Sequence, residues 1–279
     1  QGKSFIGSYV SCTGFILTPE EAQALIAKDF KNKDVLFPYL NGQDLNSNPD
    51  QSPSRWVINF FDWPLNAETD NSKKPKGPPY AADYPDCLAI VEERVKPERE
   101  TKGKSAREKW WLYERSRPAL YKAIAPRDRV IVFAQTSKTK YPALVSTGIV
   151  FDQKCIVIAP SSFSWFSVLC SHLHYWWVLQ EGSSRRTDPV YTPTDCFETF
   201  PFPADLSKNQ NLETIGEQYH NHRQEIMTNN QEGLTKTYNR FHDPEETATD
   251  IETLRQLHQQ MDEAVAAAYG WQDLDLGHD

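Results

Sequence analysis

The amino-acid sequence predicts an α+β fold, in which a mixed or antiparallel sheet with packed helices is followed by a small helical C-terminal domain. Short runs of β-branched residues separated by polar turns alternate with segments of helical periodicity. After Pro203 the composition changes to polar, glutamine-rich and acidic helix. We therefore expect residues 1–203 to form one domain and residues 204–279 a second. The β-branched runs cover residues 129–134, 143–150 and 155–158.

The first elements follow from turn and capping chemistry. Residues 4–17 are β-rich and are interrupted by Gly7 and Gly14, which predicts a strand pair or a bulged strand. Thr18 then offers an N-cap hydroxyl before a first-turn proline and two acidic residues, so a helix is expected to run to Lys28.

The middle of the chain contains two further strands, a long loop and two helices. The apolar segment 35–40 is ended by Asn41-Gly42, and alternating aromatic and aliphatic residues predict a strand over 55–61. Asparagine, lysine, proline and glycine dominate the predicted loop. The loop covers residues 62–82, and the two helices cover 83–96 and 106–125.

Three more helices are expected toward the carboxyl terminus. Residues 162–179 are apolar and aromatic on all sides, which predicts one buried helix. Residues 205–229 and 244–269 are predicted to pair as a helical hairpin. One apolar stripe of the last helix contains Ile251, Leu254, Leu257, Met261, Val265 and Ala268.

Composition is typical of a globular protein of one large or two ordinary domains. The chain has 279 residues, and its five cysteines are scattered, which argues against a zinc knuckle and a disulfide framework. The sequence contains no apolar run of membrane-spanning length and no signal pattern at its amino terminus. A cytoplasmic location is therefore expected.

The net charge of -8 conceals a strong asymmetry along the chain. Residues 204–279 contain 5 basic and 15 acidic residues, whereas residues 94–140 contain 14 basic and 5 acidic residues. Such a basic segment is the electrostatic footprint expected for phosphate binding, and a solvated helix face is the alternative. The candidate phosphate contacts are Lys102, Lys104, Arg107, Lys109, Arg115 and Arg117.

Two loops carry side chains suited to reading a polar ligand. One loop lies between the β-branched runs at residues 135–141, and the other follows the apolar helix at residues 183–188. Their hydroxyl, amide and cationic groups match the donors and acceptors of base edges, although solvated loops would have the same composition. The candidates for base recognition are Gln135, Lys138, Lys140, Tyr141, Ser184, Arg185, Arg186, Thr187 and Asp188.

Catalytic and metal-binding patterns are weak. The Gly77-Pro78-Pro79-Tyr80 segment resembles the Pro-Pro-Tyr loop of amino-methyltransferases, but glycine replaces the residue that accepts a hydrogen bond from the target amine. The pairs His172/His174 and His220/His222 have no further ligand at helical spacing, so no metal site is expected. The acidic residues near Lys96 have the wrong spacing for a metal-dependent nuclease. The sequence therefore favours a non-catalytic chain.

Seven ordered stretches together resemble one family, the MmeI-like, type IIL restriction-modification enzymes. The resemblance extends over essentially the whole chain. The stretches read FIGSYVSCTGFILTPEEAQALI, VLFPYLNGQDLN, RWVINFFDWP, VKPERE, REKWWLYERSRPALY, TDCFETFPFP and LRQLHQQMDEAVAAAYGWQDLDL.

The resemblance implies a DNA target recognition domain over residues 1–203 and a helical C-terminal domain over 204–279. It implies that double-stranded DNA and an upstream methyltransferase domain of the same polypeptide are the partners, with no membrane. The adenine methyltransferase and endonuclease, with S-adenosylmethionine and magnesium, would then lie upstream, with no cofactor in this chain. The alternatives are a stand-alone DNA-modifying enzyme, either methyltransferase or metal nuclease, and a protein-interaction module of a phage-defence complex.

Overall fold

Two four-stranded sheets form the centre of the molecule in the computed structural model, which describes residues 2–70, 77, 79–185 and 188–271. The first sheet, called the β5 sheet, is antiparallel throughout. Its strands, in spatial order, are β1 (Ser4–Ile6), β8 (Cys155–Ile158), β5 (Arg129–Ala134) and β6 (Ala143–Ser146). In register, Ile131 lies opposite Ile158. All four residues of β8 are buried, in agreement with their continuous apolar character.

The second sheet, called the β3 sheet, is mixed. Its strands are β2 (Ile16–Leu17), β4 (Arg55–Ile58), β3 (Leu36–Leu40) and β7 (Val150–Phe151), and only the β3–β7 pair is parallel. The predicted N-cap is present, because Thr18 accepts a hydrogen bond from the Glu21 amide at the start of α1 (Pro19–Lys28), and the Glu21 carboxylate accepts in return from the Thr18 amide. The α+β class with mixed and antiparallel sheets is confirmed.

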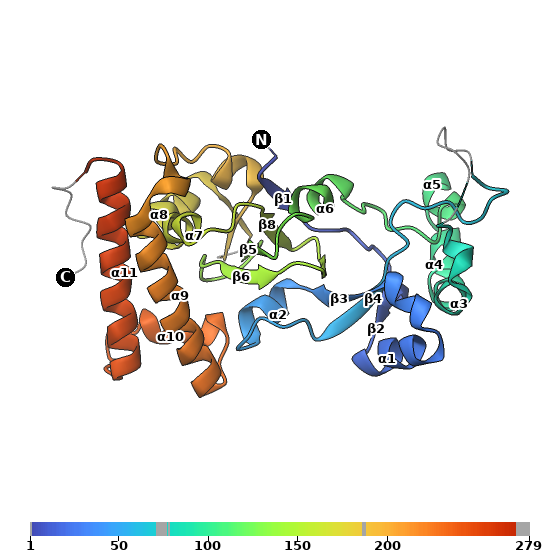
Figure 1. Cartoon of the computed structure of the whole chain (residues 1–279), viewed down its shortest axis with the longest axis horizontal. Coiled ribbons are helices and arrows are strands. Elements are labelled where there is room, and N and C mark those ends of the chain that lie inside the picture. The colour runs from blue at the N-terminus through green and yellow to red at the C-terminus, as the bar shows by residue number, and fades with distance from the viewer. Residues whose placement is uncertain (1, 71–76, 78, 186–187, 272–279) are drawn as a thin grey trace.

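The two sheets have separate hydrophobic cores. One buried cluster joins the β5 sheet to α7 (Phe163–Cys170) and to the C-terminal helices. The other joins the β3 sheet to α1 and α3 (Pro85–Arg94). Figure 1 shows the sheets between the C-terminal helices at one end and α3, α4 (Lys96–Glu100) and α5 (Lys104–Glu108) at the other. Segments that are far apart in the sequence therefore meet where the two sheets adjoin.

Two predicted strand segments are divided between the sheets. Residues 4–17 do not form one strand pair, because β1 joins the β5 sheet and β2 joins the β3 sheet. Residues 143–150 form β6 and then turn at Gly148 (φ 81°) before β7 crosses to the β3 sheet. Local propensity marked these segments as extended, but the partner of each strand is decided by tertiary packing.

The predicted helix over residues 106–125 is wrong. The segment contains the end of α5, an irregular stretch and α6 (Pro118–Ile124). Pro118 disfavours helical backbone at the preceding residue, and Arg117 has a left-handed conformation with φ 59°. Trp111 is buried in the irregular stretch, where its indole nitrogen donates to the Trp63 carbonyl at 2.9 Å. Burial of the tryptophan and the position of Pro118 therefore account for the break.

The predicted single helix over residues 162–179 is also divided. α7 ends at Cys170, and α8 (His172–Glu181) begins after Ser171, which is extended (ψ 154°). The expected burial on all sides holds for α7 except at the partly buried Trp165, but it does not hold for α8, where Trp176 is 59% exposed. Aromatic content thus gave the position of the helices correctly and overestimated the burial of the second.

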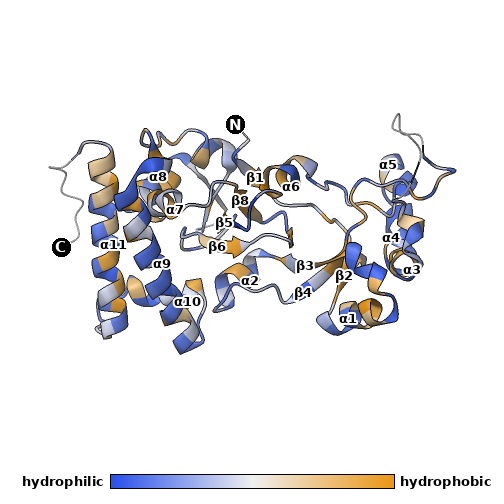
Figure 2. Ribbon diagram, viewed as in Figure 1, coloured by the Kyte–Doolittle hydropathy of each residue, from blue (hydrophilic) through white to orange (hydrophobic). Residues whose placement is uncertain are grey.

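The described part of the C-terminal segment, up to residue 271, contains three α-helices. α9 (Gln210–Asn230) and α11 (Thr249–Ala268) correspond to the predicted pair, and α10 (Leu234–Phe241) between them was not predicted. In Figure 2, α11 is banded with hydrophobic and hydrophilic residues, in agreement with its predicted apolar stripe. The helices pack onto the rest of the chain, so the boundary at residue 203 stays a prediction. The described helices include none with the length and apolar character needed to cross a membrane.

The packing of α9 against α7 depends on Gly216. A Cβ atom at this position would lie 2.3 Å from Ser167 Oγ and 2.5 Å from the Phe163 carbonyl oxygen. At the same crossing, Ser167 Oγ donates to the Leu212 carbonyl at 2.7 Å. The two helices therefore approach closely enough to continue one buried cluster from α7 into the C-terminal segment.

Candidate functional site

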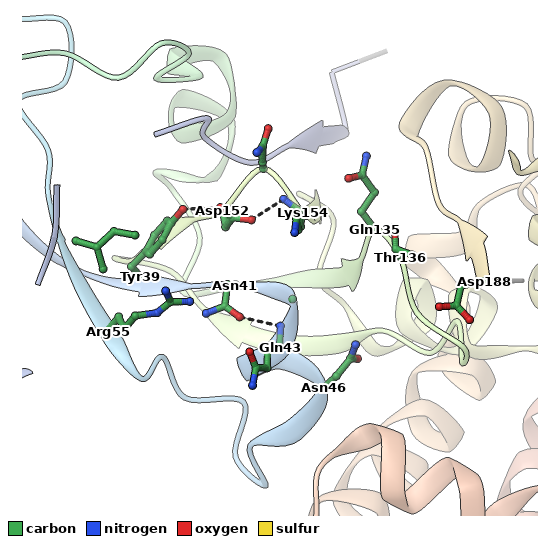
Figure 3. Close-up of a pocket in the computed structure, with 13 residues that line it drawn as sticks. Tyr39, Asn41, Gln43, Asn46, Arg55, Gln135, Thr136, Asp152, Lys154 and Asp188 are labelled. Atoms are coloured by element: carbon green, nitrogen blue, oxygen red, sulfur yellow. Dashed lines mark hydrogen bonds between the residues drawn. The ribbon is translucent and has the colours of Figure 1, made fainter. Parts of the chain in front are cut away.

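A polar groove of 750 Å³ lies where the two sheets meet. Figure 3 shows side chains from β3, β4, α2 (Gly42–Ser47) and the turn before β8 facing residues that follow β5. We call this feature the central groove. Its lining residues are Ile16, Tyr39, Asn41, Gly42, Gln43, Asn46, Arg55, Gln135, Thr136, Asp152, Gln153, Lys154 and Asp188.

One wall of the central groove is set by the N-cap of α2. Asn41 Oδ1 accepts hydrogen bonds from the amides of Gln43 (2.7 Å) and Asp44 (3.0 Å). The buried Asp44 carboxylate in turn accepts from Asn41 Nδ2 and from the amide and hydroxyl of Ser54. This network fixes the first turn of α2. The side chain of Gln43 makes no hydrogen bond with another described residue and is available to a ligand.

A second wall is the turn between β7 and β8. Asp152 Oδ2 accepts from the Tyr39 hydroxyl at 2.5 Å, and Asp152 Oδ1 accepts from the Lys154 amide at 2.9 Å. Burial, then the Asp152 charge, raises the pKa of Tyr39 far above its usual value, so the phenol stays a donor. A Cβ atom at Gly7 would lie 2.0 Å from the Asp152 carbonyl oxygen. Only glycine therefore fits at this position, where the chain leaves β1 and runs beside the turn.

The third wall begins at the end of β5 with Gln135. Its amide donates to the Lys154 carbonyl at 2.7 Å, and its carbonyl accepts from the Tyr191 amide at 2.8 Å and from Lys140 Nζ at 3.0 Å. These bonds hold the backbone and leave the side-chain amide without a hydrogen bond to another described residue. The backbone of Gln135 is therefore fixed by hydrogen bonds, and its side-chain amide faces the groove without a partner among the described residues.

Two predicted base-reading residues lie in the interior. Lys140 is 2% exposed, and burial lowers its pKa to about 8. Tyr141 is 3% exposed and stacks on Tyr238 with ring centroids 3.7 Å apart. The expectation that both are exposed loop residues is corrected, because aromatic packing and the bond to Gln135 bury them. Lys138 in the same loop is exposed.

The hairpin after α8 approaches the same groove. β9 (Ser183–Arg185) pairs with β10 (Asp188–Val190), and a bridge between Thr136 and Val190 attaches it to the segment after β5. Asp188 lines the groove. The structure thus brings the two predicted loops together. Ser184 and Arg185 are described only as backbone in β9, and Arg186 and Thr187 lie outside the described residues.

Five of the six candidate phosphate contacts line two hollows that share Tyr113 and Glu114 in their linings. Lys102, Lys104 and Lys109 line a hollow of 670 Å³, and Arg115 and Arg117 line one of 460 Å³. Arg107 is exposed on α5.

Most of these six side chains can reach a ligand. Lys102 and Lys104 each lie 3.7 Å from a glutamate one helical turn away, and such exposed pairs hold a lysine weakly. Arg117 is the exception. Its Nε donates to the Gly7 carbonyl at 3.3 Å, and burial, then Arg115, lowers its pKa.

Seven groove residues with charged or amide side chains were absent from the sequence-based candidates. They come from the strand-to-helix turn after β3, from β4 and from the turn before β8, where the sequence was interpreted only as strands and turns. From the sequence, Asn41-Gly42 was interpreted only as the end of a strand. The ability of Asn41 to cap a helix was the signal that could have indicated α2. The residues are Asn41, Gln43, Asn46, Arg55, Asp152, Gln153 and Lys154.

The charge of the central groove is balanced. Arg55 and Lys154 contribute positive charge, and Asp152 and Asp188 contribute negative charge. Amide groups make up much of the remaining lining. The arrangement is suited to a ligand with a fixed pattern of donors and acceptors, and the basic hollows are suited to anions.

Comparisons with known proteins relate to the fold and to the family of this chain. Residues 81–204 match the family model described as MmeI, target recognition domain. A solved structure of the type IIL restriction-modification enzyme MmeI in complex with DNA shares the fold, with a TM-score of 0.70 at 17% sequence identity. The match covers 98% of this chain and 33% of that chain, so this chain spans about a third of the length of that protein. No curated protein sequence matches the chain.

Proposed function

We propose that this chain is the part of a type IIL restriction-modification enzyme that recognises a double-stranded DNA sequence, because residues 81–204 match the MmeI target recognition domain model. The observation that carries the proposal is the central groove, where side-chain amides and charged groups of both signs meet between two sheets. The chain acts by binding, and the chemistry takes place on other domains.

The groove chemistry matches the edges of base pairs in the major groove. Glutamine and asparagine amides pair with adenine, arginine pairs with guanine, and aspartate accepts from the cytosine amino group. Gln135, Arg55 and Asp188 offer these three functions from three separate segments of the chain. Gln43 and Asn46 add amides from α2. A side chain held on a fixed backbone discriminates between bases better than one on a loose loop.

The basic hollows supply the contacts that do not depend on sequence. Lys102, Lys104 and Lys109 line one hollow, so this part of the surface carries positive charge although the net charge of the whole chain is -8. Phosphate contacts set affinity and register, whereas base contacts set the recognised sequence. The two features therefore divide the work of a specific DNA-binding protein.

The rest of the enzyme belongs to the same proposal. An upstream adenine methyltransferase domain would use S-adenosylmethionine, and an upstream nuclease would use magnesium. Bases that undergo methylation are flipped out of the duplex, so the recognition domain has to hold the DNA in register while this happens.

Selection from a random duplex library tests the proposal. The chain, immobilised at low salt, is expected to enrich one short sequence motif after several rounds, and Gln135→Ala is expected to relax a single position of it. The matched control is Gln218→Ala, because Gln218 lies on α9 beside a separate small hollow. Absence of any enriched motif in the wild-type chain would refute sequence recognition. Calorimetric titration with S-adenosylmethionine is expected to give no heat of binding, and a saturable heat would favour an enzyme.

A further inference from the structure

Three side chains of types that can bind a metal ion meet at the start of α8, at the opposite end of this helix from the hairpin. His172 begins α8, and His258 and Asp262 lie one turn apart on α11. Their ligand atoms, one from each side chain, all lie within 4.8 Å of one another. His172 has no ligand at helical spacing in the sequence, and its two partners come from a helix more than eighty residues away.

Each of the three side chains is oriented for a shared ion. His172 Nδ1 lies 2.6 Å and His258 Nε2 lies 3.4 Å from the same oxygen, Asp262 Oδ2. In a tetrahedral zinc site with bonds of about 2.0–2.1 Å, neighbouring ligand atoms are separated by roughly 3.3 Å, so shifts of about an ångström or less would seat an ion.

The groups behind the ligands support the same geometry. The Tyr219 hydroxyl lies 3.1 Å from His258 Nδ1 and directs the other ring nitrogen toward Asp262. The second carboxylate oxygen, Asp262 Oδ1, accepts from the His172 amide at 2.8 Å. Supporting hydrogen bonds of this kind fix ring orientation and tautomer in metal sites.

Burial leaves one open side. The side chains of His258 and Asp262 are 1% and 0% exposed, and that of His172 is 27% exposed. An ion could enter past His172 and keep a water molecule as its fourth ligand. A carboxylate buried this deeply is stabilised by nearby positive charge, which an ion would add.

We propose that His172, His258 and Asp262 form a binding site for one divalent transition-metal ion of the Zn²⁺ type. The ion cross-links α8 to α11. Because α8 leads directly into β9, the ion also stiffens the support of the hairpin that carries Asp188. The site is structural, and it does not depend on the DNA-binding function.

Cobalt provides a direct test, because four-coordinate Co²⁺ absorbs visible light. The chain is stripped of metal with a chelator and titrated with Co²⁺ and then Zn²⁺. We expect saturation at one equivalent of Co²⁺, and displacement by Zn²⁺. His172→Ala is expected to weaken Co²⁺ binding at least tenfold, and Tyr219→Phe to weaken it by about tenfold. The matched control is His222→Ala, a partly buried histidine on α9 that pairs with the Asp250 carbonyl at 2.8 Å.

A second measurement covers the case in which a variant does not fold. Thermal unfolding of the wild-type chain is recorded with Zn²⁺ and with Mg²⁺, and only Zn²⁺ is expected to raise the Tm. Absence of saturable Co²⁺ uptake, equal Co²⁺ affinity in a folded His172→Ala chain, or equal Tm values with the two ions would each overturn the proposal and leave a hydrogen-bonded His-Asp-His cluster.

Discussion

The central groove and the basic hollows differ in how firmly their side chains are held. In the groove, the side chains of Asn41 and Asp152 each accept two hydrogen bonds, and the backbone of Gln135 is fixed by hydrogen bonds of its own. In the hollows, Lys102 lies in the bend between α4 and α5, Lys104 begins α5, and each forms an exposed ion pair of 3.7 Å with a glutamate. Discrimination between bases needs a fixed geometry, whereas attraction to phosphates needs only nearby charge. Under the proposed function, the difference places sequence specificity and affinity in separate parts of this chain.

The largest expected effect concerns the buried support of Gln135. Burial lowers the pKa of Lys140 to about 8, below the usual 10.5, so between pH 8 and 10.5 the unfolded chain binds more protons. The stability of the wild-type chain should therefore rise with pH across this window, relative to Lys140→Met, by up to about 3 kcal/mol. Urea unfolding of both chains at pH 7.5, 9 and 10.5 measures the difference. A difference that does not vary with pH would mean that Lys140 is not desolvated.

The next effect concerns the wall formed by Asp152. Tyr39→Phe removes the hydroxyl that donates to this carboxylate, and we expect a loss of about 2 kcal/mol in the free energy of unfolding. DNA discrimination should fall as well, with the salt dependence unchanged. The control is Tyr84→Phe, which removes a similar bond to Asp34 of 3.1 Å outside the groove. Equal loss of discrimination in the two variants would show that stability, and not groove geometry, is responsible.

Charge removal at a basic hollow should weaken binding to every sequence alike. The double variant Lys102→Gln/Lys109→Gln is expected to make the log-log salt slope shallower by about two. Relative to wild type, the ratio of affinities would change about 16-fold between 50 and 200 mM salt. Fluorescence anisotropy with a labelled duplex measures this. The control is Lys208→Gln/Lys236→Gln, which removes two exposed lysines from the C-terminal segment. A changed motif in the first variant would contradict the division between groove and hollows.

The smallest expected effect tests the α2 side of the groove. Gln43 lies outside the family-matched residues 81–204, yet it lines the groove opposite Gln135. Gln43→Ala is expected to reduce discrimination at one base position by roughly tenfold, with normal stability, since its side chain makes no bond to another described residue. Competition binding with single-base variants of the enriched duplex checks this. The comparison variant is Gln23→Ala on α1, where the exposed glutamine is outside the groove. If the two variants discriminate equally between the single-base duplexes, α2 does not contribute to base recognition.

The sequence by itself determined the α+β class, the buried β-branched strands and the start of α1, because these depend on local periodicity and capping. It also located Gln135, Asp188 and the basic residues near α5, because their chemistry is visible in short stretches. The resemblance to the MmeI-like family was confirmed over residues 81–204.

Only the tertiary structure decided which strands share a sheet and which distant segments line one groove. The turn after β3 and the turn before β8 meet there because β7 leaves the run of β6 to pair with β3. Burial of Tyr141 likewise depends on α10, which stacks Tyr238 on its ring. The meeting of His172 with His258 and Asp262 has the same origin. Such contacts are set by the packing of whole elements, and no local pattern of residues encodes them.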